Sequence, residues 1–148
     1  MTNHLKLADS YLRLSDEEKK YGNESESITN QREIIRDYCK KQGIIIVSEF
    51  VDDGYSGGNF ERPGFQAMLN HLAAGKANTV ITKDLSRLGR DMTESSYYAE
   101  RFFPEHGIHY LAPGNDFDSM GDNLMAPFQF AMNDVYLRDT SRKVKQTL

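Results

Sequence analysis

Residues 44–51, with the sequence IIIVSEFV, form a continuous apolar run that decides the fold class. Such a run is typical of a β-strand covered on both faces, as in a parallel sheet. The glycine-rich segment DDGYSGGNFERPG follows it, and Pro63 then suits the first turn of a helix. Apolar residues after Pro63 recur at helical spacing as far as Gly75. The segment therefore predicts a buried strand, a loop and a covering helix.

The same alternation of strand and helix extends through the rest of the chain. Further strands are expected at residues 8–14, 78–83 and 108–113, and further helices at 28–42, 92–106 and from about 124 to 148. The polar segment 16–27 has no apolar period and is expected to be a loop. This order predicts an α/β fold with a mainly parallel central sheet, helices on both faces and a long C-terminal helix. It divides the chain into an α/β domain at residues 1–123 and a connector or interface helix at 124–148.

The composition is that of a soluble, cytoplasmic, single-domain protein. Its 148 residues carry a formal net charge of −4, and no stretch approaches the roughly 20 apolar residues of a membrane span. The single cysteine, Cys39, fits a reducing compartment and a packing role. A net negative charge argues against tight DNA binding by this chain alone. Four cations near the C-terminus are the candidates for local DNA contact: Arg138, Arg142, Lys143 and Lys145.

The carboxyl ends of the expected strands carry the candidate chemistry, because ligands of a parallel sheet bind beyond those ends. The first strand ends at Arg13-Leu14-Ser15, the second at Asp52-Asp53, and the third in the loop KDLSRLGR at 83–90. The four histidines lie outside these loops, so a serine–histidine relay has little support. Arginine pairs with phosphate oxygens and stabilises the charge of a pentacoordinate phosphorus. The pattern therefore favours phosphoryl transfer over acyl transfer.

Five short motifs, in this order, resemble one enzyme family. They are YLRLS at 11–15, NQR at 30–32, FVDDGYSG at 50–57, ERPGF at 61–65 and DLSRLGRD at 84–91. Together they resemble the catalytic domain of serine recombinases, the resolvase/invertase superfamily, and in particular its large branch of transposon-type and integrase-type enzymes. The segment YLRDTSRK at 136–143 is also similar to that branch. Each motif alone is weakly specific, but the five in sequence cover most of the chain from residue 11 to residue 91.

The resemblance implies a reaction and a role for each matching residue. Ser15 matches the nucleophile, which attacks a DNA phosphodiester, forms a 5′-phosphoserine link and releases a 3′-hydroxyl. Three arginines match phosphate-binding residues: Arg13, Arg87 and Arg90. Three further residues match side chains that support the active site: Gln31, Asp52 and Arg62. The family uses no metal and no nucleotide cofactor, because the phosphoserine ester conserves the bond energy for rejoining.

The resemblance also implies partners. The family binds duplex recombination sites as a homo-oligomer, in which dimers pair into an active tetramer that cuts four strands. For this acidic chain, DNA affinity is expected to come mainly from segments beyond Leu148. Ser86 departs from the family pattern, since small resolvases usually carry an aspartate at this place. The role of that carboxylate is then absent or passes to Asp84 or Asp91, and no general acid is assigned.

Simpler interpretations of the same residues stay open. Ser15 after a strand could be a helix N-cap, and Arg13 could form a surface ion pair. Asp52 and Asp53 could bind Mg²⁺ in a metal-dependent phosphotransferase or nuclease, which a chelator would inactivate. A third alternative is a non-catalytic assembly or regulatory module of the same fold, which the Ser86 departure favours. Retention of the serine and of the arginines argues against that module.

Overall fold

The computed structural model describes residues 5–23, 27–55 and 62–120. One five-stranded sheet runs through the molecule in the order β2-β1-β3-β4-β5, with its first four strands parallel and β5 antiparallel. The strands are β1 (Leu7–Ser15), β2 (Ile45–Tyr55), β3 (Thr79–Ile81), β4 (His109–Ala112) and β5 (Phe117–Asp118). The expected mainly parallel α/β sheet is confirmed. The expectation that the strand at 44–51 is covered on both faces is wrong, because β2 lies at the edge of the sheet, where Ile45 and Val47 are 48% and 42% exposed. The strand also continues to Tyr55, into the segment expected to be a loop.

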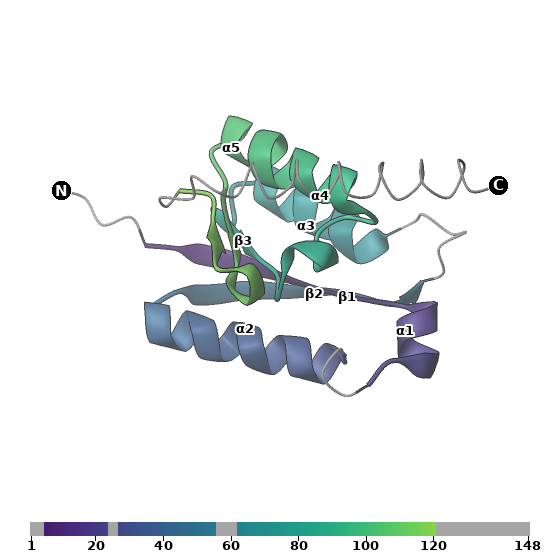
Figure 1. The fold of residues 1–148 in the computed structure, drawn as a ribbon. Coiled ribbons are helices and arrows are strands. Elements are labelled where there is room, and N and C mark those ends of the chain that lie inside the picture. The colour runs from purple at the N-terminus through teal and green to yellow at the C-terminus, as the bar shows by residue number, and fades with distance from the viewer. Residues whose placement is uncertain (1–4, 24–26, 56–61, 121–148) are drawn as a thin grey trace, which may run out of the picture.

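Helices cover both faces of this sheet, with α2 on one side and α3, α4 and α5 on the other (Figure 1). The helices are α1 (Asp16–Tyr21), α2 (Ile28–Gln42), α3 (Pro63–Ala73), α4 (Met92–Tyr97) and α5 (Phe103–Glu105). The π-helical turn η3 (Tyr98–Phe102) joins α4 to α5, and two 3₁₀ turns, η2 (Leu85–Arg87) and η4 (Pro113–Asn115), follow β3 and β4. None of the helices in the described ranges is long and apolar enough to cross a membrane.

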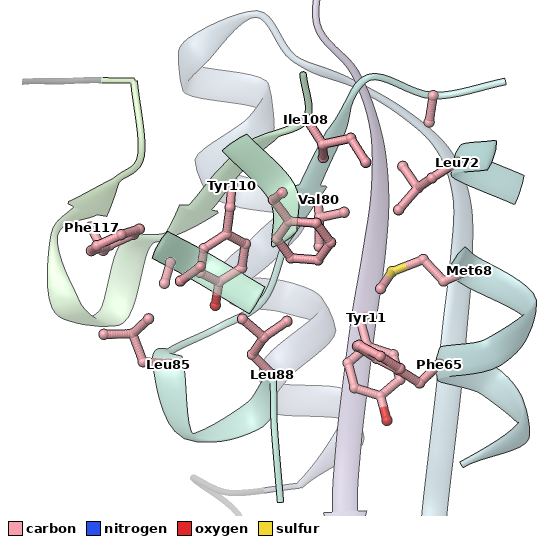
Figure 2. Packing of buried hydrophobic residues seen from close by; sticks show 14 residues of the cluster. Tyr11, Phe65, Met68, Leu72, Val80, Leu85, Leu88, Ile108, Tyr110 and Phe117 are labelled. Carbon is pink, nitrogen blue, oxygen red and sulfur yellow. The ribbon is translucent and has the colours of Figure 1, made fainter. Parts of the chain in front are cut away.

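Alternation along β1 builds the two halves of the core. Leu12 packs toward α2 with Ile35 and Cys39, whereas Tyr11 packs toward α3 and α4 with Phe65. Figure 2 shows the second of these clusters, in which aromatic and aliphatic side chains of α3 meet those of the sheet. Burial raises the pKa of the Cys39 thiol to about 11, so this cysteine is an inert packing residue, as expected.

Two short elements differ from expectation. The segment expected as a loop begins with helix α1, which the spacing Ser15-x-x-Glu18 initiates as a capping box. Its six residues are too few to show an apolar period, which is why the periodicity missed it. The two-residue strand β5 was missed for the same reason. The expected helix at 124–148, with the four candidate DNA-contacting cations, lies outside the described residues.

Candidate functional site

The residues with candidate chemistry meet where β1 and β2 end and where the loop after β3 returns. Arg13 lies directly opposite Asp52 in the parallel pair β1–β2. The loop after β3 contains η2 and reaches back to β1, since the Arg13 side chain donates hydrogen bonds to backbone carbonyls of residues 86–89. The structure therefore brings the three expected strand ends to one edge of the sheet.

Ser15 ends β1 and is at the same time the N-cap of α1. Its Oγ accepts a hydrogen bond from the Glu18 backbone N–H at 3.0 Å, and Glu18 Oε1 accepts from the Ser15 N–H at 3.1 Å. The alternative that Ser15 is a helix cap is confirmed. A hydroxyl that accepts in a cap still has its own hydrogen to donate, and the side chain is half-buried rather than sealed in the core.

Arg13 holds the loop after β3 rather than a surface carboxylate. Its guanidinium donates to the carbonyl oxygens of Ser86 at 2.5 Å, Gly89 at 3.2 Å and Arg87 at 3.4 Å. Its backbone is clamped by the buried amide of Gln31, which donates to Arg13 O at 3.0 Å and accepts from Arg13 N at 3.2 Å. Burial lowers the pKa of the Arg13 guanidinium, and the nearby charge of Arg87 acts in the same direction. The surface ion pair considered for Arg13 is not the arrangement found.

Arg87 is the most enclosed of the candidate arginines, with 7% of its side chain exposed. Its Nη1 donates to Glu18 Oε2 at 2.7 Å and to the Arg13 carbonyl at 3.1 Å. Its Nε is buried and has no hydrogen-bond partner among the described residues. Burial of the Glu18 carboxyl opposes ionisation, but hydrogen bonds from the Ser15 N–H and from Arg87 outweigh it and lower the Glu18 pKa. Glu18 thus links the serine to the arginine.

Arg62 and Arg90 converge on a second carboxylate, Glu94. Arg62 Nη2 pairs closely with Glu94 Oε1, while Arg90 Nε donates to Glu94 Oε2 at 2.9 Å. The Arg62 guanidinium also donates to the Leu88 carbonyl at 2.7 Å and lies over the Phe65 ring at 4.0 Å. The Arg62 side chain is 10% exposed and the Arg90 side chain 46% exposed, so Arg90 is the more solvent-accessible of the two.

The N-terminus of α4 anchors this second cluster. Asp91 is its N-cap, and Asp91 Oδ1 accepts from the Glu94 N–H at 2.8 Å. Glu94 Oε1 accepts from the backbone N–H of Arg90 at 3.2 Å. In a capping box this carboxylate would instead accept from the N–H of the N-cap residue, Asp91. Gly89 lies against α4, where an added Cβ would come within 2.5 Å of the Ser95 nitrogen. A side chain at Gly89 would therefore push the loop away from the helix.

Asp52 is buried and its carboxylate accepts three hydrogen bonds. Oδ2 accepts from the Tyr11 hydroxyl at 2.7 Å and from the Phe65 N–H at 3.0 Å, and Oδ1 accepts from the Gly64 N–H at 2.8 Å. Burial raises the pKa of Tyr11, and the hydrogen bond to Asp52 adds to this. Asp52 therefore caps the N-terminus of α3 from the neighbouring strand.

Asp53 does not join Asp52 in a metal-binding pair. Successive side chains of a strand point to opposite faces, and Asp53 is half-exposed with Lys19 Nζ at 3.7 Å. In the part of the chain that the structure describes, no three acidic, histidine or cysteine side chains form a group suited to a metal ion. The donors around Asp52 thus do not fit the Mg²⁺ alternative.

Ser86, at which the resemblance implies an aspartate in small resolvases, is exposed in η2. Its backbone N–H donates to Asp84 Oδ1 at 3.0 Å, and its hydroxyl pairs closely with the same oxygen. Asp84 thus caps η2 and lies beside Ser86, whereas Asp91 is occupied in capping α4. Of the two carboxylates considered as substitutes, Asp84 is the one in contact with the Ser86 side chain.

Sequence reasoning missed Glu18, the carboxylate that links Ser15 to Arg87. The signal was present, because Ser-x-x-Glu directly after a strand is a helix-initiating pattern that places the glutamate beside the serine. Sequence reasoning also missed Glu94 as the partner of Arg62. No local pattern predicts that pair, since 32 positions separate the two residues.

Comparison with known proteins agrees with the overall fold. Residues 8–148 match the family described as Resolvase, N terminal domain. The N-terminal catalytic domain of TP901-1 integrase superposes with a TM-score of 0.69 at 22% identity, over 94% of this chain and 98% of that one. A resolvase family site-specific recombinase from Streptococcus pneumoniae gives a TM-score of 0.71 at 21% identity, over 95% and 94% of the two chains. At these identities the structures show a shared fold.

A third structure and one sequence relative extend the comparison. The C-terminal catalytic domain of ISC1926 TnpA, an IS607-like serine recombinase, superposes with a TM-score of 0.55 at 20% identity, over 94% of this chain and 84% of that one. Uncharacterized immunity region protein 3 of Bacillus phage phi105 is 35% identical over 65 residues, which are 44% of this chain and 77% of that protein. These similarities agree with the resemblance carried by the five motifs.

Proposed function

The chain belongs to the resolvase family, and from this premise we propose that it is the catalytic domain of a site-specific DNA recombinase or transposase working through a 5′-phosphoserine intermediate. The observation that carries the proposal is the link between Ser15 and Arg87 through Glu18. A hydroxyl and a buried guanidinium with an unpartnered Nε are held together at the edge where a parallel sheet binds ligands. That pair suits attack on a phosphate.

In the proposed reaction, Ser15 Oγ attacks the phosphorus of a DNA phosphodiester. An Oγ–P bond forms, the bond from phosphorus to the 3′ oxygen breaks, and the 3′ oxygen leaves as a hydroxyl after gaining a proton. The Ser15 hydroxyl loses one proton in the same step. Rejoining is the reverse attack by a 3′-hydroxyl on the phosphoserine ester. Each direction exchanges one phosphate ester for another, so the step needs no external energy source.

The arginines are proposed to stabilise the negative charge that builds on the phosphate oxygens. Arg87 offers its buried Nε, and Arg90 is the most exposed of the four. Arg13 positions the loop after β3, because its contacts with residues 86–89 hold the segment that carries Arg87 and Arg90. Arg62 and Asp52 fix the start of α3 and the second cluster, and Gln31 fixes the Arg13 backbone.

The proposed partners are duplex DNA and further copies of the same chain. The net charge of −4 supports a division of labour in which segments outside the α/β domain supply most of the DNA affinity. The candidate cations of residues 138–145 and residues beyond 148 are proposed for that role. For the reaction we propose a homodimer, two copies of which pair into a tetramer. The proposed location is the cytoplasm, where the DNA of a mobile element is accessible.

Covalent trapping tests the function. The native gene product is mixed, in a chelator, with a duplex from the joined ends of its mobile element, nicked so that the cut strand cannot be rejoined. We expect an adduct that mass spectrometry maps to Ser15 and that Ser15→Ala abolishes. Ser27→Ala is the matched control, since Ser27 is also a helix N-cap, accepting from the Asn30 N–H at 3.0 Å. An adduct that survives Ser15→Ala contradicts the mechanism, and a bound site without any adduct favours the non-catalytic module.

A further inference from the structure

Glu18 contacts both halves of the proposed reaction centre with one carboxylate. Oε1 accepts from the backbone N–H of Ser15 and Oε2 accepts from Nη1 of Arg87. We propose that Glu18 is a positioning residue for strand cleavage, fixing Ser15 and Arg87 relative to each other and leaving the Nε edge of Arg87 for the scissile phosphate. The inference rests on the proposed function and adds a residue to it.

On the serine side, Glu18 closes a small hydrogen-bonded ring. Ser15 Oγ accepts from Glu18 N at 3.0 Å while Glu18 Oε1 accepts from Ser15 N at 3.1 Å. The ring lies at the junction of β1 and α1, just where the pairing of β1 with β2 shifts register between Leu14 and Ser15. The sheet ladder therefore holds Ser15 less firmly than the residues before it, and the ring supplies the missing constraint.

On the arginine side, Glu18 takes one corner of the guanidinium and leaves the opposite edge. Nη1 donates to Glu18 Oε2 at 2.7 Å and to the Arg13 carbonyl at 3.1 Å. Nε, on the far edge, is buried and unpartnered among the described residues, an arrangement that is unfavourable until an acceptor arrives. The Nε and Nη2 atoms form the side-on fork with which arginine binds a phosphate bidentately. A phosphate oxygen at this edge would satisfy Nε.

Two other roles for Glu18 predict different results. A carboxylate that merely competes with phosphate for Arg87 would slow the reaction, so removing its charge would accelerate cleavage. A carboxylate that merely caps α1 would change stability and leave the reaction rate of the folded protein unchanged. The contact with Nη1, away from the unpartnered Nε, speaks against competition. The ion pair reaching from α1 to Arg87 speaks against a cap alone.

The test compares Glu18→Gln with Glu17→Gln in the native gene product on the nicked duplex. Glutamine has one acceptor oxygen, so its NH₂ group must face either the Ser15 N–H or the Arg87 Nη1, both of which are donors. We expect adduct formation at saturating protein to slow by roughly 10²-fold, the usual effect of misplacing a reacting group by about 1 Å. The dissociation constant for the duplex should change less than about twofold, because most affinity lies elsewhere. Glu17 is exposed on the same helix, so Glu17→Gln removes the same charge and should leave the rate of adduct formation unchanged.

An activity-independent measurement accompanies the rates. The ¹⁵N signals of the Arg87 side chain should move and broaden in Glu18→Gln and stay in place in Glu17→Gln. Three results would each overturn the inference. The Arg87 signals could be unchanged, or Glu18→Gln could form the adduct at the wild-type rate or faster. The third is a loss of adduct-formation rate no larger than that of the cap variant Ser27→Ala. Absence of an adduct from the wild type refutes the proposed function and takes the inference with it. A normal wild-type adduct with a normal Glu18→Gln rate refutes the inference alone.

Discussion

Replacing Asp52 with asparagine should destabilise the domain far more than replacing its neighbour Asp53. Asp52 is buried, and its carboxylate accepts three hydrogen bonds, from the Tyr11 hydroxyl and from the N–H groups of Gly64 and Phe65. An asparagine amide retains one acceptor oxygen. If that oxygen keeps the two bonds of Oδ2, the NH₂ group must face the Gly64 N–H, and a buried donor then meets a donor.

The size of the effect follows from these contacts. One lost hydrogen bond to a charged acceptor is worth about 1.5–3 kcal/mol. Loss of the negative charge at the N-terminus of α3 adds about 0.3–1 kcal/mol. The expected decrease in the free energy of unfolding is therefore about 2–4 kcal/mol. For a chain of this size each kcal/mol lowers Tm by roughly 3–4 °C, so Tm should fall by about 10 °C.

Urea unfolding followed by circular dichroism measures this difference. Asp53→Asn is the matched control, because Asp53 has 42% of its side chain exposed and its ion pair with Lys19 spans 3.7 Å. Such exposed pairs contribute less than about 1 kcal/mol. Equal, small effects of the two substitutions would refute the assignment of Asp52 as the cap of α3. Added Mg²⁺ should leave the urea midpoints of the wild type and of both variants unchanged. The metal-dependent alternative requires instead that Mg²⁺ stabilise the wild type.

Two further predictions concern the loop after β3 and the helix α1. Gly89→Ala should destabilise the domain by about 1–3 kcal/mol and abolish adduct formation on the nicked duplex, because its Cβ would lie 2.5 Å from the Ser95 nitrogen; near-normal stability and rate would refute the close approach. Glu18 has a lowered pKa in the folded protein, so its stabilisation is fully present above its unfolded pKa of about 4.3 and is lost as the pH falls through the folded value. Unfolding free energies measured from pH 7 downward should therefore show the wild type losing its advantage over Glu18→Gln in acid; an advantage that persists there contradicts the ion pair.

The parts of the fold that follow from periodicity were predictable, and the parts that depend on single contacts were not. Helix α2 lies at the expected residues 28–42 because its apolar stripe and the following Gly43 are both local signals. Helix α1 is too short for a stripe, although Ser15 and Glu18 announce its first turn. Chain order and strand ends predicted which residues gather at the site. They could not predict that Arg87 would meet a carboxylate 69 positions away, because that contact depends on how the loop after β3 folds back.

The carboxylates beside the arginines indicate how an acidic domain can hold the phosphate-binding site that we propose. Arg87 is paired with Glu18, and Arg62 and Arg90 share Glu94, so two carboxylates offset half of the charge of the four arginines before DNA arrives. A duplex phosphodiester with one negative charge gains little by displacing water from such arginines, which fits the expectation that affinity comes from other segments. The pentacoordinate transition state of the proposed reaction carries more charge on its oxygens than the ground state does. In the proposed reaction, arginines held in place by carboxylates would therefore favour the transition state over bound DNA, and only that difference would accelerate the chemical step.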